Sequence, residues 1–335
     1  MTTLLTLLAF IPLGTFLVWR GSSALESSSE ALSAYYELPP TVHGAIVVAV
    51  GSSFPELSST VLSTLLHGEF ELGLSAVVGS AIFNILVIPG VSGVVAGRLS
   101  TGRDLVFKEG QFYLISVAVL LLTFSLAVIY NPVEGARLEG EISRPVALVP
   151  ILLYLLYLFI QQQEVRERDN PRRPEGFRPL RDWLRLLLSL LLILGGVELL
   201  VRSALLLGDL LGTPSFIWGV TIIATVTSLP DAFVSVRLAR AGKGVVSLSN
   251  VLGSNIFDLL VAVPAGVLLA GATRVDFGVA APLMAMLTVA TVVLFAAMRT
   301  NLYLSRREAW LLLAVYFLFL LWVLFEATGL TSLTY

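Results

Sequence analysis

The sequence predicts an all-α polytopic membrane protein, with ten transmembrane helices arranged as two inverted five-helix repeats. Three observations lead to this fold class. Hydrophobic residues make up 56% of the 335 residues and charged residues only 13%, whereas soluble domains carry about 25% charged residues. Several apolar runs are long enough to cross a bilayer, which takes about 20 residues per helix. A short pattern around Glu56 recurs around Asp231, 175 residues later in the chain.

The apolar runs and the polar segments between them define ten expected helices. We interpret the first run as a retained helix and not a signal peptide, because no basic segment precedes it and no small-residue cleavage site follows. The arginine-rich segment 162–182 is too short for a domain and is interpreted as a basic cytoplasmic linker. The first repeat then covers residues 1–161, with its motif at 49–84, and the second covers 183–335, with its motif at 224–258. The helices are expected at 2–36, 40–66, 70–96, 110–130, 146–161, 183–211, 215–240, 244–269, 275–298 and 308–328.

The basic residues are distributed unevenly between the connections, which predicts how the chain is oriented. They follow the third, fifth, seventh and ninth helices, beginning with Arg98, Arg103 and Lys108 after the third. These connections are therefore expected to be cytoplasmic, with both termini outside a plasma or inner membrane. Because each half has an odd number of helices, the halves enter the membrane from opposite sides. Many secondary transporters have this inverted-repeat plan, with the binding site where the repeats meet.

Composition excludes several classes of function. The formal net charge of −2 gives no reason to expect a nucleic-acid partner. The chain has no cysteine, so it has no disulfide, thiolate nucleophile or cysteine-bound metal, and its two histidines are too few for a histidine-rich zinc site. We expect no enzymatic activity, no cofactor and no protein partner. The expected partners are the lipid bilayer and metal cations.

The repeated pattern combines hydroxyls, a proline and a carboxylate inside apolar runs. Its first copy reads GSSFPE at 51–56 and GSAIFN at 79–84; its second reads VTSLPD at 226–231 and GSNIFD at 253–258. Hydroxyls three and four residues before the carboxylate share its helix face. Each proline frees the backbone carbonyl four residues earlier, that of Gly51 or Val226. An acid within a membrane-spanning helix is costly and usually functional.

These oxygen-bearing residues predict one hard-cation site shared by the two repeats. Calcium takes about 6–8 oxygen ligands in flexible geometry, whereas magnesium tends to keep its waters. Glu56 and Asp231 would together neutralise one divalent ion. The remaining oxygens come from the carboxylate of Asp258, the amide of Asn84 and the hydroxyls of Ser52, Ser53, Ser80, Thr227, Ser228 and Ser254.

The two copies resemble the signature regions of the calcium/cation antiporter superfamily, which includes the sodium/calcium exchangers. In that family the first region reads G-[ST]-S-x-P-E-L then G-S-x-x-x-N, and the second T-S-x-P-[ED] then G-S-N-x-x-[ND]. The resemblance implies exchange of calcium for sodium by alternating access, with Glu56 and Asp231 as the central calcium ligands. It also implies sodium ligation by the backbone carbonyls of Ala49 and Ala224. Ser52 departs from the usual threonine of the family.

The two copies are most similar to those of the potassium-dependent sodium/calcium exchangers. The similarity lies in Ala81 of the first copy and in Asp231 and Asp258 of the second. Three acids bring up to three negative charges against the two positive charges of calcium. Asp258 then either carries a proton or binds a monovalent cation. The resemblance to potassium-dependent exchangers implies that this cation is potassium. Both alternatives are open at this point.

Three other functions are compatible with part of this pattern: calcium/proton exchange, an uncoupled channel and membrane proteolysis. A calcium/proton exchanger usually carries a glutamate after a Gly-Asn-Ala-Val run, which is absent here. An uncoupled channel with carboxylates in its filter is not excluded by the sequence, whereas the Tyr-Asp and Gly-x-Gly-Asp signatures of membrane aspartyl proteases are missing. Glu26 and Glu30, one turn apart on the first helix, either line an ion path or face cytoplasmic water.

Overall fold

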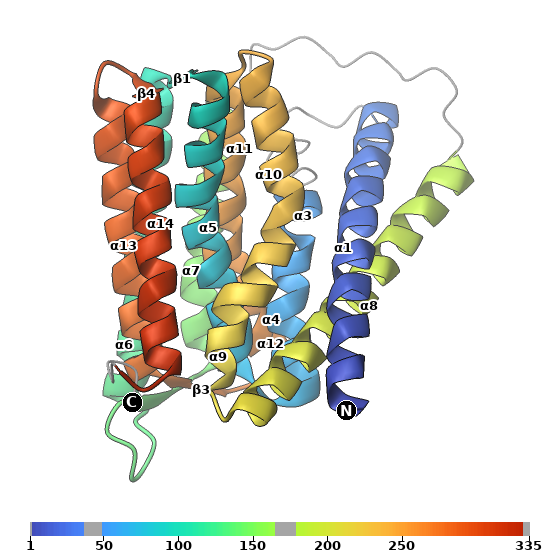
Figure 1. The fold of residues 1–335 in the computed structure, drawn as a ribbon, viewed down its shortest axis with the longest axis vertical. Helices are drawn as coiled ribbons and strands as arrows, with labels where there is room; N and C mark the ends of the chain where they lie inside the picture. The colour runs from blue at the N-terminus through green and yellow to red at the C-terminus, as the bar shows by residue number, and fades with distance from the viewer. Residues whose placement is uncertain (1, 37–48, 165–178, 331–335) are drawn as a thin grey trace.

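A computed structural model describes residues 2–36, 49–164 and 179–330 (Figure 1). The chain forms a bundle of long helices, and within these ranges nine are long and apolar enough to cross a membrane. The start of α1 (Thr2–Tyr35) and the end of α14 (Arg306–Ala327) lie at the same end of the bundle (Figure 1). The pair of β1 (Arg98–Ser100) and β4 (Tyr303–Ser305) lies at the opposite end. This largely helical membrane fold confirms the predicted fold class.

The first half supplies five of the expected helical segments, one of them divided. The helix expected at 40–66 is divided at Ser53, and its residues 40–48 lie outside the described ranges. Pro55 accounts for the division, because it cannot donate the backbone hydrogen bond that a continuous helix would need at that turn. The elements are α1 (Thr2–Tyr35), α3 (Ala49–Ser52), α4 (Phe54–His67), α5 (Phe70–Ala96), η2 (Leu105–Glu109), α6 (Gly110–Tyr130) and α7 (Arg144–Glu164).

The second half follows the same order, with π-helical turns next to its motif. The π-helical segment η3 comes directly before Ala224, and η4 begins at Asp258. Such turns break the regular i to i−4 bonding and occur frequently at functional sites. The elements are α8 (Pro179–Leu211), α9 (Ser215–Trp218), η3 (Gly219–Ile223), α10 (Ala224–Arg240), α11 (Gly244–Phe257), η4 (Asp258–Ala262), α12 (Val263–Ala270), α13 (Phe277–Arg299) and α14 (Arg306–Ala327).

Corresponding elements of the two halves run in opposite directions across the bundle. In Figure 1, α1 rises from the N-terminal end, whereas its counterpart α8 descends toward that end. The same holds for α5, which rises, and for the α11–α12 helix, which descends. The inverted arrangement predicted from the odd number of helices per half is therefore present in the fold.

Two short antiparallel strand pairs, which the sequence pattern did not predict, join the halves at opposite ends. β1 (Arg98–Ser100) pairs with β4 (Tyr303–Ser305), in register Leu99 to Leu304. β2 (Glu139–Ile142) pairs with β3 (Thr273–Asp276), in register Gly140 to Val275. β1 follows α5 and β4 follows α13, whereas β2 follows α6 and β3 follows α12. Each pair therefore joins a loop of one half to a loop of the other half, outside the apolar bundle.

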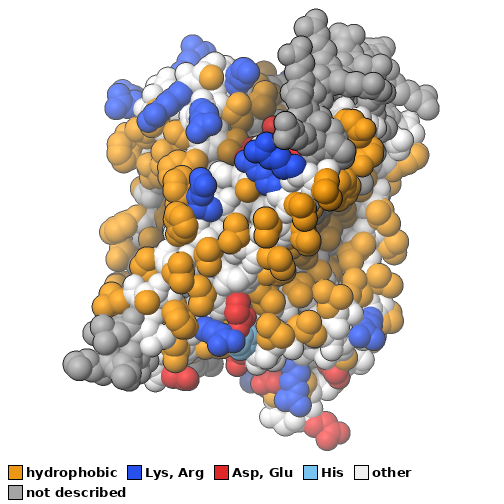
Figure 2. Space-filling model, turned by 90° about the vertical axis from the view of Figure 1, so that its right-hand side faces the viewer, with side chains coloured by type: hydrophobic (Ala, Val, Ile, Leu, Met, Phe, Trp, Pro, Cys, Tyr) orange, Lys and Arg blue, Asp and Glu red, His pale blue; other side chains and the backbone are white. Residues whose placement is uncertain are grey.

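α5 and the α11–α12 helix form the centre of the fold and are buried along most of their length. Fewer than half of the residues in each of the other spans are buried, and a broad hydrophobic band covers the face seen in Figure 2. Lys and Arg side chains gather on that face toward the end that holds β1 and β4, and most of its acidic side chains lie toward the other end. An apolar belt between polar ends is the surface that a bilayer requires.

α1 and α8 pack closely against each other through small residues. A Cβ added at Gly196 of α8 would lie 2.8 Å from the carbonyl oxygen of Gly14 on α1, so a larger residue does not fit without a shift. Close backbone approach at small residues is a common way for membrane helices to associate. The pair therefore forms one closely packed unit beside the central helices.

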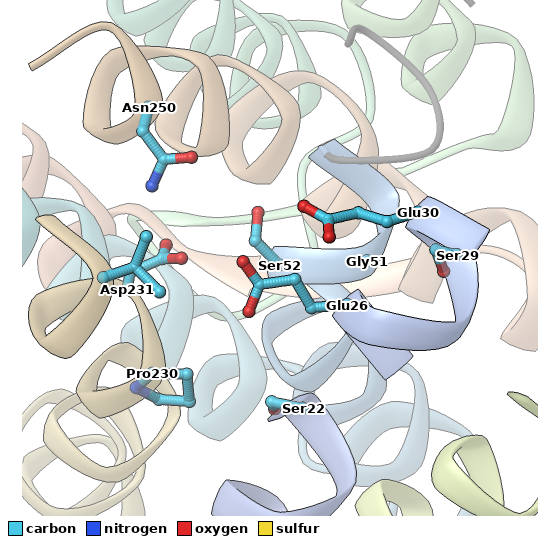
Figure 3. A pocket seen from close by; sticks show the side chains of 10 residues that line it. Ser22, Glu26, Ser29, Glu30, Gly51, Ser52, Pro230, Asp231 and Asn250 are labelled. Atoms are coloured by element: carbon cyan, nitrogen blue, oxygen red, sulfur yellow. The ribbon is translucent and has the colours of Figure 1, made fainter. Parts of the chain in front are cut away.

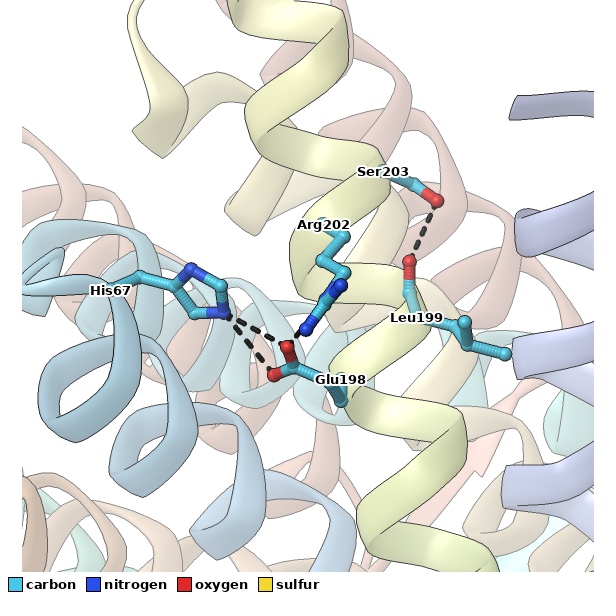
Figure 4. A network of polar contacts seen from close by, with 5 residues as sticks. All are labelled: His67, Glu198, Leu199, Arg202 and Ser203. Carbon is cyan, nitrogen blue, oxygen red and sulfur yellow. Dashed lines mark hydrogen bonds and ion pairs between the residues drawn. The ribbon is translucent and has the colours of Figure 1, made fainter. Parts of the chain in front are cut away.

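A polar network fastens α8 to α4 (Figure 4). The Nε2 atom of His67 lies 3.1 and 3.2 Å from the two carboxylate oxygens of Glu198. The Nε atom of Arg202, one turn along α8, donates to Glu198 Oε1 at 2.6 Å. Glu198 is thus held from its own helix and from α4, and its charge is balanced within an apolar segment.

Candidate cation site

The two motifs meet at the centre of the bundle, on α3, α4, α5, α10, α11 and η4. Gly79 makes this approach possible: a Cβ there would lie 2.8 Å from the Cα of Val220 in η3, so only glycine lets the two backbones touch. Glu56 stands in the first turn of α4, where the helix dipole favours a negative charge. Glu56, Asp231 and Asp258 are all buried, with at most 5% of each side chain exposed.

Ser80 links the carboxylate of the first repeat to a hydroxyl of the second. Its Oγ atom donates to Glu56 Oε1 at 3.0 Å and lies 2.7 Å from the Oγ atom of Ser228. Ser80 and Ser228 are fully buried. The sequence placed these three residues in one predicted site, and the structure brings them into direct contact.

The hydroxyl pair of the first copy contacts the second copy at Ser254. Ser52 Oγ lies 3.0 Å from Ser254 Oγ, and Ser53 Oγ donates to the Ser254 carbonyl oxygen at 3.5 Å. Thr227 Oγ1 donates to the Ala224 carbonyl of its own helix at 3.3 Å, and the Thr227 side chain also interacts with the Glu56 carboxylate of the first repeat. Ala49, the other predicted carbonyl ligand, is the first residue of α3.

Asn84 is held in place by a residue that the sequence analysis did not select. Its Nδ2 atom donates to Oδ1 of Asn255 at 3.0 Å. Asn255 in turn donates to the Ala81 carbonyl at 3.1 Å and contacts the Tyr113 hydroxyl at 3.2 Å. Asn255 orients Asn84 so that its Oδ1 atom is left facing away from these bonds. The signal was present, because Asn255 replaces the alanine of the first copy within an otherwise matching pattern.

Several buried oxygens at this place have no hydrogen-bond donor within 3.5 Å in the described chain, although the Ser53 side chain interacts with Asp258. They are Glu56 Oε2, Asn84 Oδ1 and both carboxylate oxygens of Asp258. Buried polar atoms in folded proteins are nearly always paired, and an unpaired buried carboxylate is costly. A cation placed among these oxygens would satisfy them, and no Lys, Arg or His in the described ranges forms an ion pair with the three acids.

The three carboxylates are close enough to influence one another but do not form a compact cluster. Glu56 interacts electrostatically with Asp231, and Asp258 interacts with both. Among the residues that the structure describes, no three His, Cys, Asp or Glu side chains are placed to hold one metal ion together. Hydroxyl, amide and carbonyl oxygens would therefore have to complete the shell of a bound cation, as calcium allows.

A narrow cavity of about 30 Å³ reaches Asp231 from the side of α1 (Figure 3). A space of this size holds a water molecule or a single cation. Glu26 and Glu30, whose surroundings the sequence left open, both line it. The remaining lining residues come from α1, α3, α10 and α11: Ser22, Ser29, Gly51, Ser52, Pro230, Val234 and Asn250.

The sequence model described as sodium/calcium exchanger protein matches this chain twice, at residues 6–162 and 182–325. The chain belongs to that family. The two matched segments correspond to the two halves of the fold, so this polytopic membrane protein of the exchanger family is built from two related units. The exact repeat boundaries at 161 and 183 stay a prediction, because residues 165–178 lie outside the described ranges.

Similar proteins are found in archaea, bacteria and animals. Sodium/calcium exchanger MaX1 of Methanosarcina acetivorans is 26% identical over 280 residues, covering 74% of this chain and 78% of that protein. Inner membrane protein YrbG of Escherichia coli is 25% identical over 264 residues, covering 76% and 77%. Human sodium/potassium/calcium exchanger 5 is 25% identical over 324 residues, covering 71% and 64%.

A solved structure of a family member has the same fold. The sodium-calcium exchanger NCX_Mj, soaked with sodium and without calcium, superposes with a TM-score of 0.60 at 24% sequence identity. The match covers 94% of this chain and 97% of the NCX_Mj chain. The chain therefore has the same overall fold as NCX_Mj.

Proposed function

We propose that this protein is a secondary antiporter that exchanges calcium for sodium across a membrane. The observation that carries the proposal is the set of buried oxygens without donors, on Glu56, Asn84 and Asp258, where the two repeats meet. Membership of the sodium/calcium exchanger family supports it, as do relatives that are described as sodium/calcium exchangers. Glu56 and Asp231 are the proposed central ligands.

Coupling follows from competition for the same oxygens. Calcium needs more ligands and more neutralising charge than one sodium ion does. A site that holds either calcium or sodium, but not both loads, carries them in opposite directions when it opens alternately to the two sides. The remaining proposed ligands are the hydroxyls of Ser52, Ser53, Ser80, Thr227, Ser228 and Ser254 and the carbonyls of Ala49 and Ala224.

Alternating access requires one part of the bundle to move against another. The α1–α8 pair is the proposed moving part, because α1 lines the cavity next to Asp231 and packs on α8 through Gly14 and Gly196. The central helices α5 and α11–α12 carry the ligands and would stay fixed. The Glu198 contacts to His67 and Arg202 would hold the pair against α4 in the present arrangement.

Potassium co-transport is a second possibility, and one observation favours it. Both carboxylate oxygens of Asp258 are buried without a donor, so calcium alone would leave one of the three acids uncompensated. Potassium or a proton at Asp258 would balance it, and several relatives are sodium/potassium/calcium exchangers. Stimulation of calcium flux by potassium that is lost in Asp258→Asn supports potassium co-transport. Calcium flux that does not change with the potassium concentration excludes it.

We propose that the end of the bundle that holds β1 and β4 is cytoplasmic. Its basic side chains, such as Arg98, Lys243 and Arg306, follow the distribution expected of cytoplasmic loops, and both termini would then face outward. The chain has no cysteine, so a single cysteine at Ser100 can be labelled without background. Labelling of Ser100→Cys by an impermeant reagent only after cells are opened supports this orientation.

The transport proposal is tested by radioactive calcium uptake into sodium-loaded proteoliposomes. Uptake should require an outward sodium gradient and should fall to the level of protein-free vesicles in Glu56→Gln. Calcium uptake that continues without a sodium or proton gradient would indicate a channel. Dependence on a proton gradient alone would indicate calcium/proton exchange.

A further inference from the structure

The cavity between α1, α3 and α10 has features that the central site does not explain. Its mouth is formed by Glu26 and Glu30, whose side chains are exposed, and its inner end by Asp231, which is 5% exposed. In Figure 3 the two glutamate carboxylates point from α1 toward Ser52 and Asp231. The cavity thus leads from an exposed pair of acids to one of the proposed ligands.

The acids form a continuous electrostatic series from the surface to the centre. Glu30 interacts with Glu26, Glu26 with Asp231, and Asp231 with Glu56. The only basic side chain of the described chain that interacts with Glu26 is the exposed Arg237, on α10. Negative charge dominates along the path, which raises the local concentration of cations.

A polar atom inside the cavity also lacks a partner. Ser22 is 4% exposed, lines the cavity, and its Oγ atom has no hydrogen-bond partner among the residues that the structure describes. A buried hydroxyl normally finds a partner, so this oxygen is available to a water molecule or to a cation in the cavity. Glu26 and Glu30 are like charges one helical turn apart, an arrangement that by itself weakens a helix. A binding role accounts for both features.

We propose that this cavity is a cation vestibule, where Glu26 and Glu30 hold a partly hydrated divalent cation before it reaches Asp231. Ser22 and Ser52 offer hydroxyl oxygens, and Asn250 an amide oxygen, to the cation or its waters on this path. The proposal rests on the proposed cation transport and adds to it a distinct binding step on α1. Because α1 belongs to the pair proposed to move, its movement would open or close the vestibule.

The first test measures the charge preference of the cavity without any transport. Since the chain has no cysteine, Ser22→Cys provides a single thiol inside the purified protein. Its modification by methanethiosulfonate ethylammonium, which is positive, is compared with that by methanethiosulfonate ethylsulfonate, which is negative. After correction for reactivity with free thiol, the positive reagent should react about tenfold faster, as expected of two nearby carboxylates in partly aqueous surroundings. Millimolar calcium should slow the reaction.

Charge variants in the Ser22→Cys background decide the outcome. Glu26→Gln combined with Glu30→Gln should bring the rate ratio close to one, whereas Asp104→Asn, an exposed acid at the same end of the bundle, should leave it unchanged. If the ratio of the two reaction rates stays at about ten in the double variant, the proposal is wrong. Ser29→Cys, also in the cavity lining, serves as a second reporter. If neither cysteine reacts, water does not enter the cavity and the proposal is wrong.

The second test measures transport from each side separately. In Glu26→Gln/Glu30→Gln vesicles, the calcium concentration for half-maximal uptake should rise about tenfold for calcium presented at the β1–β4 end. It should be unchanged for calcium presented at the other end, and maximal rates should be preserved. Wild-type vesicles without sodium-driven uptake would contradict the proposed function. Normal wild-type uptake with an unaltered double variant would contradict only the vestibule.

Discussion

Asp258 gives the sharpest prediction about stability, because its carboxylate is fully buried and neither oxygen has a hydrogen-bond donor within 3.5 Å among the described residues. The change Asp258→Asn keeps the shape and removes the charge. The first repeat already carries the neutral Asn84 at the equivalent position. A charged side chain at the centre of a membrane helix costs about 2.5–3.5 kcal/mol on insertion scales, and a buried amide without partners costs about 1–3 kcal/mol.

When Asp258 is ionised in the cation-free protein, the difference between these two costs predicts that Asp258→Asn stabilises the protein by about 1 kcal/mol. For a chain of this size that raises the midpoint of thermal unfolding by about 2 °C. Calcium should stabilise the wild type by about 2.7 kcal/mol at one hundred times its dissociation constant, and this stabilisation should be smaller in the variant. The assay is thermal unfolding of the detergent-purified protein in chelator and in calcium.

A matched control separates this effect from loss of charge in general. Asp209→Asn removes an exposed acid at the end of α8, and surface changes of this kind usually alter stability by less than about 0.5 kcal/mol. If Asp258→Asn is less stable than the wild type in chelator, Asp258 accepts hydrogen bonds from the protein. Its oxygens would then not be available as ligands for a cation.

Two further predictions concern the α1–α8 pair. Gly196→Ala should destabilise the protein by about 1–3 kcal/mol, because the added methyl group overpacks against Gly14. Gly195→Ala is the control: a Cβ there meets nothing within 4 Å, so this change should be neutral or stabilising by up to about 1 kcal/mol. Equal effects of the two changes in thermal unfolding would contradict the close helix contact. Glu198→Gln should lower the free energy of unfolding by about 0.5–1.5 kcal/mol, because it weakens the hydrogen bonds from His67 and Arg202. A thermal unfolding midpoint equal to that of the wild type would show that the network does not hold α8 to α4.

The helices were predictable from the sequence because hydropathy and length decide them. The expected ranges 2–36 and 70–96 agree closely with α1 and α5. The division of the second helix at Ser53 follows from Pro55, whose effect on backbone bonding is local. The strand pairs β1–β4 and β2–β3 were not predictable, since strands of three or four residues form only when two distant loops are brought together.

The candidate site was predictable in its residue types but not in its contacts. Symmetry between the repeats selected Glu56 and Asp231, whereas Asn255, which bonds to Asn84, could be found only from its departure from that symmetry. Likewise, the positions of Glu26 and Glu30 on the first helix do not show which neighbours they face. Only the packing of α1 against α3 and α10 places them beside Asp231.

The measurement that tests the account most directly is sodium-driven calcium uptake by reconstituted wild-type protein and by Glu56→Gln, run side by side. The account predicts uptake in the wild type that follows the imposed sodium gradient, and no uptake above protein-free vesicles in Glu56→Gln, with both proteins equally folded by thermal unfolding. Uptake by Glu56→Gln close to that of the wild type would contradict the central claim that the buried oxygens around Glu56 bind the transported cation.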